Sequence, residues 1–258
     1  MKKAISYTLI FLGFQLLAGG LVTTALALTG HNEWVTSPYT AIASLTVSSL
    51  ATLILFLRMH WAEATTDYLR SKPWIVICWS VFTALGVVVP SIAIQEQMPE
   101  LPNLVEEQMG AIMSVPGGYF AICLAAPMIE ELVMRGAVLR ALLAWKPEKR
   151  WAMIVVSALL FALIHMNPAQ MPHAFVMGLL LGWMFERTNS IVPGVAFHWA
   201  NNTVAYFLFR LYPDPDTRLI DILGTQGRVL MAVGFSLMIL LPSIYQLYLH
   251  MKRVKEAA

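Results

Sequence analysis

The chain of 258 residues is 58% hydrophobic and 12% charged, with a formal net charge of +2 at pH 7. Because soluble domains usually contain about 25% charged residues, this composition excludes a large soluble domain and predicts an all-α, polytopic membrane protein. No Lys/Arg run is long enough to indicate nucleic-acid binding, so nucleic acid is not an expected partner.

Long apolar runs predict eight membrane-spanning helices in a single membrane domain over residues 1–258. We expect the first span to be retained, although it imitates a secretory signal, because its apolar run from Ala4 to Thr29 exceeds a typical signal segment. The spans are expected at residues 4–28, 39–58, 74–95, 117–143, 151–166, 169–186, 190–210 and 228–250. In the sixth of these spans, Gly178 and Gly182 are four residues apart and predict close helix packing.

The distribution of Lys and Arg predicts that both termini lie in the cytoplasm. With eight spans in that orientation, only Arg210, Arg218 and Arg228 lie outside, and Arg135 lies within a span. The positive-inside rule favours this arrangement. The cytoplasmic segments then hold Lys2, Lys3, Arg58, Arg70, Lys72, Arg140, Lys146, Lys149, Arg150, Arg187, Lys252, Arg253 and Lys255.

The fourth span contains the segment PMIEELVMRG (127–136), which places three charged side chains among apolar ones. Each such charge at the bilayer centre costs ~2.5–3.5 kcal/mol on insertion scales. Glu131 and Arg135 are four residues apart and can neutralise each other on one helix face. Glu130 is rotated by about 100° from Glu131 around the helix, so it lacks the arginine partner. A buried carboxylate without a partner can take a proton, so Glu130 is the candidate general base. Pro127 can kink the span and admit water.

Two later spans contribute further polar side chains. The fifth span places His165 on the same face as Phe161, and the seventh places His198 and Asn202 on one face. An amide and an imidazole can donate hydrogen bonds to an oxyanion. His173, near a span edge, is expected to be interfacial. Complementary polar groups on three separate spans favour one shared cavity.

The order and spacing of these residues resemble the motifs of the CPBP family of intramembrane endopeptidases, which includes the Ras-converting CAAX proteases and bacterial Abi proteins. The resemblance covers roughly residues 117–210, the expected catalytic core, and implies that the pair of Glu131 and Arg135 supports the site. The motifs are Glu130-Glu131-x-x-x-Arg135, Phe161-x-x-x-His165 and His198-x-x-x-Asn202.

The resemblance also implies a mechanism. Glu130 would activate a water molecule that His165 helps to hold, and His198 with Asn202 would stabilise the oxyanion. The expected partners are membrane lipid and a protein or peptide substrate, lipidated if the activity is CAAX-type processing. The expected location is the bacterial inner membrane.

A metal-dependent mechanism is an open alternative. Glu130, His165 and His198 have the donor types of a His2Glu zinc site, but no H-E-x-x-H motif is present. Because the better-supported mechanism of the family is glutamate-dependent and metal-free, no cofactor is expected.

Other classes of protein fit the sequence less well. All four Asp residues fall outside the predicted spans, which excludes an intramembrane aspartyl pair, and no G-x-S-x-G motif occurs. A non-catalytic immunity or scaffold protein on the same fold is the main alternative. A proton-coupled carrier is a third, because buried Glu and His also mark ion paths.

Overall fold

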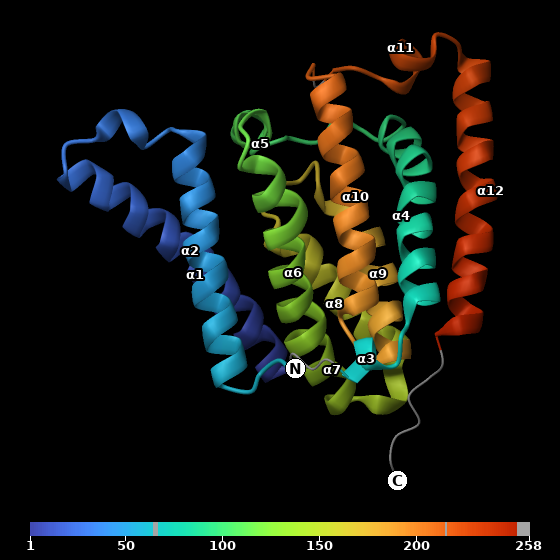
Figure 1. The fold of residues 1–258 in the computed structure, drawn as a ribbon, viewed down its shortest axis with the longest axis horizontal. Helices are drawn as coiled ribbons and strands as arrows, with labels where there is room; N and C mark the ends of the chain where they lie inside the picture. Colours follow the sequence, from blue (N-terminus) through green and yellow to red (C-terminus); the bar gives the residue numbers. More distant parts are fainter. Residues whose placement is uncertain (64–66, 215, 252–258) are drawn as a thin grey trace.

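The computed structural model describes residues 1–63, 67–214 and 216–251, and within these ranges the chain is helical and contains no strand (Figure 1). Three of the charges used for the predicted orientation, Lys252, Arg253 and Lys255, lie outside the described residues. The first helix begins and the last helix ends at the same end of the bundle.

Each predicted span coincides with a helix or a continuous helical run, to within a few residues. The fourth is a run of four pieces: η2 (Phe120–Ala125), α6 (Ala126–Glu131), η3 (Leu132–Leu139) and α7 (Arg140–Trp145). The others are α1 (Lys2–Leu28), α2 (Pro38–Arg58), α4 (Trp74–Gln95), α8 (Arg150–Ile164), α9 (Met171–Thr188), α10 (Val192–Leu211) and α12 (Gln226–His250).

Four of the described helices, α1, α2, α4 and α12, are long and apolar enough to cross a membrane. By contrast α8 has 15 residues, or roughly 22 Å at about 1.5 Å per residue, against a hydrocarbon core of about 30 Å. The count of eight spans and the orientation of the termini therefore stay predictions.

Short helices occupy several of the connections. The longest of them, α5 (Glu106–Ser114), begins with two glutamates, which suit the positive end of a helix dipole. The remaining short helices are η1 (Asn32–Trp34), α3 (Asp67–Arg70), η4 (Pro147–Lys149) and α11 (Leu219–Leu223).

The helices form a bundle with a separate hairpin at one edge (Figure 1). In the bundle, α4 packs against both α10 and α12, and α8 packs against α9. Helix α1 contacts the bundle at η3, α7 and α8, and α2 contacts it at η2, η3, α5 and α6. The predicted close packing at Gly178 is confirmed, because a Cβ atom there would lie 2.9 Å from the Cα atom of Ala158.

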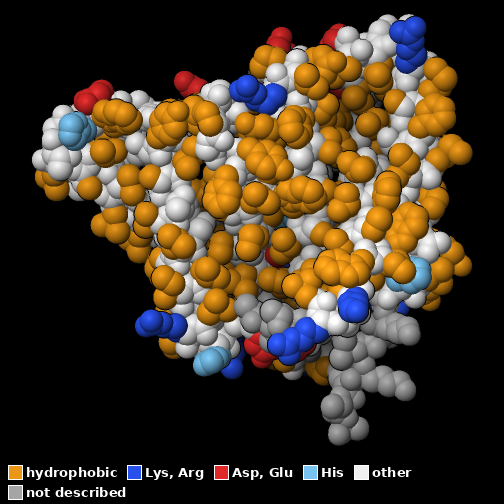
Figure 2. Space-filling model, viewed as in Figure 1, with side chains coloured by type: hydrophobic (Ala, Val, Ile, Leu, Met, Phe, Trp, Pro, Cys, Tyr) orange, Lys and Arg blue, Asp and Glu red, His pale blue; other side chains and the backbone are white. Residues whose placement is uncertain are grey.

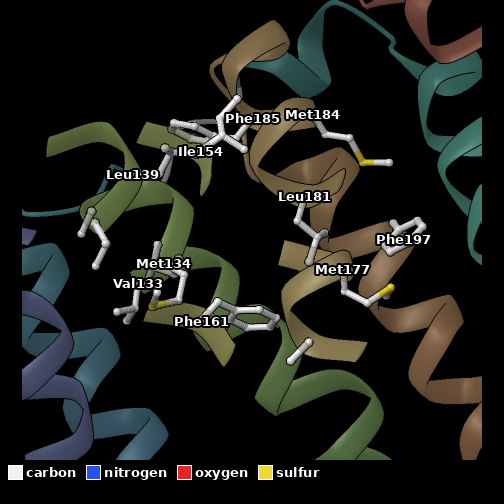
Figure 3. Packing of buried hydrophobic residues seen from close by; sticks show 14 of the residues in the cluster. Val133, Met134, Leu139, Ile154, Phe161, Met177, Leu181, Met184, Phe185 and Phe197 are labelled. Carbon is white, nitrogen blue, oxygen red and sulfur yellow. The ribbon is translucent and has the colours of Figure 1, made fainter. Parts of the chain in front are cut away.

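A buried apolar cluster lies between the helices that carry the motifs (Figure 3). It joins η3, α8, α9 and α10 and therefore fixes the relative positions of the polar side chains these helices carry. Among its members are Val133, Met134, Leu139, Ile154, Phe161, Met177, Leu181, Met184, Phe185 and Phe197.

The outer surface is that of an integral membrane protein. Hydrophobic side chains cover the middle of the face shown in Figure 2, and the charged side chains gather toward its two ends. On α12, Phe235 and Met238 are 67% and 72% exposed. Such a broad apolar surface would be costly in water and suits contact with lipid.

Candidate active site

The helical run that carries Glu130 has wider, π-helical turns before and after α6. The π-helical segments η2 and η3 flank α6, and such wide turns are frequent at functional sites. The amide of Ala126 bonds to the carbonyl of Ala121, five residues earlier. The amide of the next residue, Pro127, has no hydrogen, so it cannot continue this pattern.

The missing hydrogen of Pro127 frees a carbonyl that another helix uses. A bond five residues back from Pro127 would reach the carbonyl of Ile122. Instead, the side-chain amide of Asn202 donates to that oxygen over 3.1 Å, and Asn202 accepts a bond from Asn201 over 3.3 Å. Asn202 is thus positioned by the widened turn, and one of its two amide hydrogens is already engaged.

Glu131 and Arg135 form the predicted ion pair. The guanidinium donates from Nη1 to Oε1 of Glu131 over 2.9 Å, and the two side chains are 0% and 1% exposed. Arg135 also donates to the carbonyl of Gly178 over 3.4 Å. A buried pair of this kind needs such additional bonds to offset the loss of hydration.

The ring of Phe161 is the centre around which the polar groups are arranged. The guanidinium carbon of Arg135 lies 4.3 Å from its centroid. The rings of His165 and His198 lie edge-on to it at centroid distances of 5.0 and 5.9 Å. One buried aromatic side chain therefore positions the ion pair and both motif imidazoles.

The hydrogen bonds of the two motif imidazoles fix their tautomers. Nδ1 of His165 donates to the carbonyl of Phe161 over 2.8 Å, and Nδ1 of His198 donates to Oε1 of Glu131 over 3.3 Å. A carbonyl or a carboxylate can only accept, so each neutral ring carries its proton on Nδ1. In both rings Nε2 is then an acceptor, and that of His198 lies 3.7 Å from Oε2 of Glu130.

A cavity of about 570 Å³ brings the candidate residues together. Glu130, His165, His198 and Asn202 line it, whereas Glu131 and Arg135 are not among the lining residues and lie buried behind them. Much of the remaining wall is apolar and comes from α2, α5 and η2. Such a cavity has room for an extended peptide segment beside the carboxylate of Glu130.

One family model matches residues 113–204. Its description is "Type II CAAX prenyl endopeptidase Rce1-like". Residues 113–204 are therefore similar to that family. This match confirms the resemblance drawn from the motifs, and it covers every motif residue. Neither the curated proteins nor the solved structures gave a significant match.

The matched region also contributes cavity residues that were not among the predicted site residues. His173, expected at the membrane interface, instead lines the cavity, as do Gln170 and Asn201. The segment HMNPAQMPH sets His173 and His165 on either side of one short connection, and this proximity could have indicated a shared cavity.

The zinc alternative requires a cluster of metal donors. Among the described residues, no three or more His, Cys, Asp or Glu side chains are arranged to hold a metal ion. The Nδ1 atoms of His165 and His198 are engaged by protein oxygens. The metal-free mechanism stays a prediction that a chelator can test.

Replacing Gly194 by alanine should disturb the ion pair from the opposite helix. A Cβ atom at Gly194 would lie 2.7 Å from Oε2 of Glu131 and 3.3 Å from Cδ2 of Leu181. The carboxylate must then move away from Nδ1 of His198. We expect kcat/KM for peptide cleavage to fall on the order of 10²-fold, as for small misplacements elsewhere in enzymes.

A matched glycine and a shorter acid control this experiment. Gly182→Ala brings a Cβ atom to 2.9 Å from Cγ2 of Ile154 and so disturbs packing without touching Glu131. In the Gly194→Ala background, Glu131→Asp should recover part of the activity because it withdraws the carboxylate. Wild-type kcat/KM in Gly194→Ala would show that the close contact has no role.

Proposed function

We propose that the protein is an intramembrane endopeptidase in which Glu130 activates a water molecule. The observation that carries the proposal is the 3.7 Å separation between Oε2 of Glu130 and Nε2 of His198, in a cavity also lined by His165. Glu131 is less suited to this role because Arg135 holds its carboxylate in a buried ion pair.

The first step is the attack of water on a peptide carbonyl carbon. A water molecule beside Glu130 can donate one hydrogen bond to its carboxylate and the other to Nε2 of an imidazole, because both are acceptors. Its lone pair is then free to attack. As the new C–O bond forms, Glu130 takes the proton.

The following steps need hydrogen-bond donors and a proton for the leaving amine. Nε2 of His198 can donate only after it receives the proton held by Glu130, and Glu131 then stabilises the imidazolium through Nδ1. The second amide hydrogen of Asn202 is a further donor for the oxyanion. When the C–N bond breaks, the amine takes the proton, and an acid and an amine leave.

The substrate in this proposal is a membrane-associated protein or peptide. The cavity wall contributed by α2 and α5 is apolar and suits an apolar substrate segment; it includes Leu45, Met109 and Met113. In CAAX-type processing the substrate protein is lipidated at its C-terminal region, consistent with the description of the matching family.

The proposal includes the membrane arrangement expected from the sequence. One membrane domain crosses the bacterial inner membrane eight times with both termini in the cytoplasm, and residues 117–210 form its catalytic core. The location of the first and last helix ends at one end of the bundle supports an even number of crossings.

A comparison of membrane proteomes tests the function. Cells producing the wild type and Glu130→Gln at equal levels should differ in a set of membrane proteins or peptides that stay uncleaved in the variant. Identical proteomes would contradict the peptidase proposal. A biological function that survives Glu130→Gln would favour the non-catalytic immunity or scaffold alternative.

Treatment with a chelator should leave cleavage unchanged. Because Glu130 supplies the base in the proposed mechanism, 1,10-phenanthroline should not alter the rate of the purified protein in detergent. A zinc peptidase assayed in the same buffer is the positive control. Loss of cleavage that added Zn²⁺ restores would establish the metal-dependent alternative instead.

A further inference from the structure

His173 is a third imidazole in the cavity wall and belongs to none of the three motifs. It projects from the first turn of α9 and lines the cavity together with Glu130, His165 and His198. It is close enough to both motif histidines for electrostatic interaction with them. The proposed mechanism gives this side chain no role so far.

A hydroxyl group on α4 holds the His173 ring. Oγ of Ser91 lies 2.7 Å from Nδ1 of His173. The buried hydroxyls of Thr8, Ser80 and Ser243 instead donate to a carbonyl of their own helix, four residues earlier. Ser91 makes no such bond within the described ranges, so its proton is available to the ring.

With Ser91 as the donor, this bond sets the tautomer of His173 opposite to that of the other two rings. When the hydroxyl of Ser91 donates to Nδ1, the neutral ring of His173 carries its proton on Nε2. Ser91 is not among the cavity-lining residues, so Nε2 is the ring nitrogen left for a molecule in the cavity. In their neutral forms, His165 and His198 offer acceptors there, whereas His173 offers a donor.

This inference rests on the peptidase function proposed above. We propose that His173 is a further catalytic residue, which donates a hydrogen bond from Nε2 to the scissile peptide carbonyl and to the oxyanion formed from it. His173 transfers no proton. The proton still passes from water to Glu130 and finally to the leaving amine.

The need for such a donor follows from the order of the proton transfers. Nε2 of His198 becomes a donor only after it has received a proton, whereas the substrate carbonyl must be polarised before that. A neutral N–H of His173 is in place from the start. It also adds no positive charge next to the imidazolium that forms at His198.

Substitutions at His173 separate catalysis from packing. His173→Phe removes the donor and should lower kcat on the order of 10²–10³-fold, as for other oxyanion donors. KM should change little, because the bond strengthens in the transition state. His173→Gln retains an amide donor and should restore part of kcat. His250→Phe, at the exposed end of α12, is the matched control and should leave kcat unchanged.

The outcomes distinguish this inference from the proposed function. If Glu130→Gln is inactive but His173→Phe has the wild-type kcat, the role of His173 is wrong and the peptidase function stands. If Glu130→Gln cleaves as well as the wild type, the proposed role of Glu130 as the general base fails instead. Equal losses in His173→Phe and His173→Gln, accompanied by a lower melting temperature, would show that the ring only ties α4 to α9.

A measurement without turnover tests the tautomer directly. The ¹⁵N spectrum of histidine-labelled wild-type protein in lipid nanodiscs should show His173 protonated on Nε2, assigned by the signal lost in His173→Gln. Ser91→Ala should weaken this preference and lower kcat less than His173→Phe does. A proton on Nδ1 of His173 in the wild type would overturn the proposal.

Discussion

Replacing Glu130 by glutamine should abolish peptide cleavage while the protein keeps its fold. Glutamine has the same shape but cannot take a proton from water, and general-base catalysis typically contributes about 10²–10⁴-fold. We therefore expect kcat to fall by at least about 10³-fold. The measurement is the rate of cleavage of a substrate identified by the proteomic comparison, with purified protein in detergent.

The stability of the Glu130→Gln variant should match the wild type. The side chain of Glu130 is 19% exposed and lies 3.7 Å from Nε2 of His198, while Arg135 is paired with Glu131, so the substitution leaves no buried cation unpaired. Glu148→Gln, on the connection after α7, is the matched control and should retain full activity. An active Glu130→Gln protein would remove the general base from the mechanism.

Of these substitutions, replacing Arg135 by methionine should lower the free energy of unfolding the most. Arg135 and Glu131 are both buried, and removing one partner of a buried pair typically costs about 3–5 kcal/mol, because an uncompensated charge is left. Arg135 also contacts the ring of Phe161, so its loss loosens the packing around both motif imidazoles. Thermal unfolding in detergent, followed with kcat, measures both effects.

A double substitution separates the charge from the catalytic support. Glu131→Gln combined with Arg135→Met removes both charges, so the melting temperature should recover toward the wild-type value. Activity should stay low, because a neutral amide stabilises the imidazolium of His198 less well than a carboxylate does. A single Arg135→Met variant as stable and active as the wild type would contradict the role of the pair.

The positions of the helices could be predicted because long apolar runs mark them. The apolar run from Ala4 to Thr29 corresponds to α1, and the run after Pro38 corresponds to α2. The number of crossings could not be fixed in this way. The helices α8, α9 and α10 are shorter or carry the polar groups of the site, so their hydropathy is a weaker signal.

The candidate site was predictable where its contacts are local in sequence. The pair of Glu131 and Arg135 follows from a spacing of four residues on one helix. The contact of His173 with Ser91 spans 82 residues and depends on how α4 packs in the bundle. Likewise, the bond from Asn202 to the carbonyl of Ile122 depends on the π-helical turn before Pro127, which spacing alone does not reveal.

The central claim is that the carboxylate of Glu130 acts as the base inside a water-accessible cavity. Chemical rescue of Glu130→Ala by formate measures this directly, because the cavity of about 570 Å³ has room for the small carboxylate. We predict that Glu130→Ala is inactive and that added formate restores cleavage in proportion to its concentration, but does not restore Glu131→Ala. Full activity of Glu130→Ala without formate, or rescue of Glu131→Ala alone, would contradict the account.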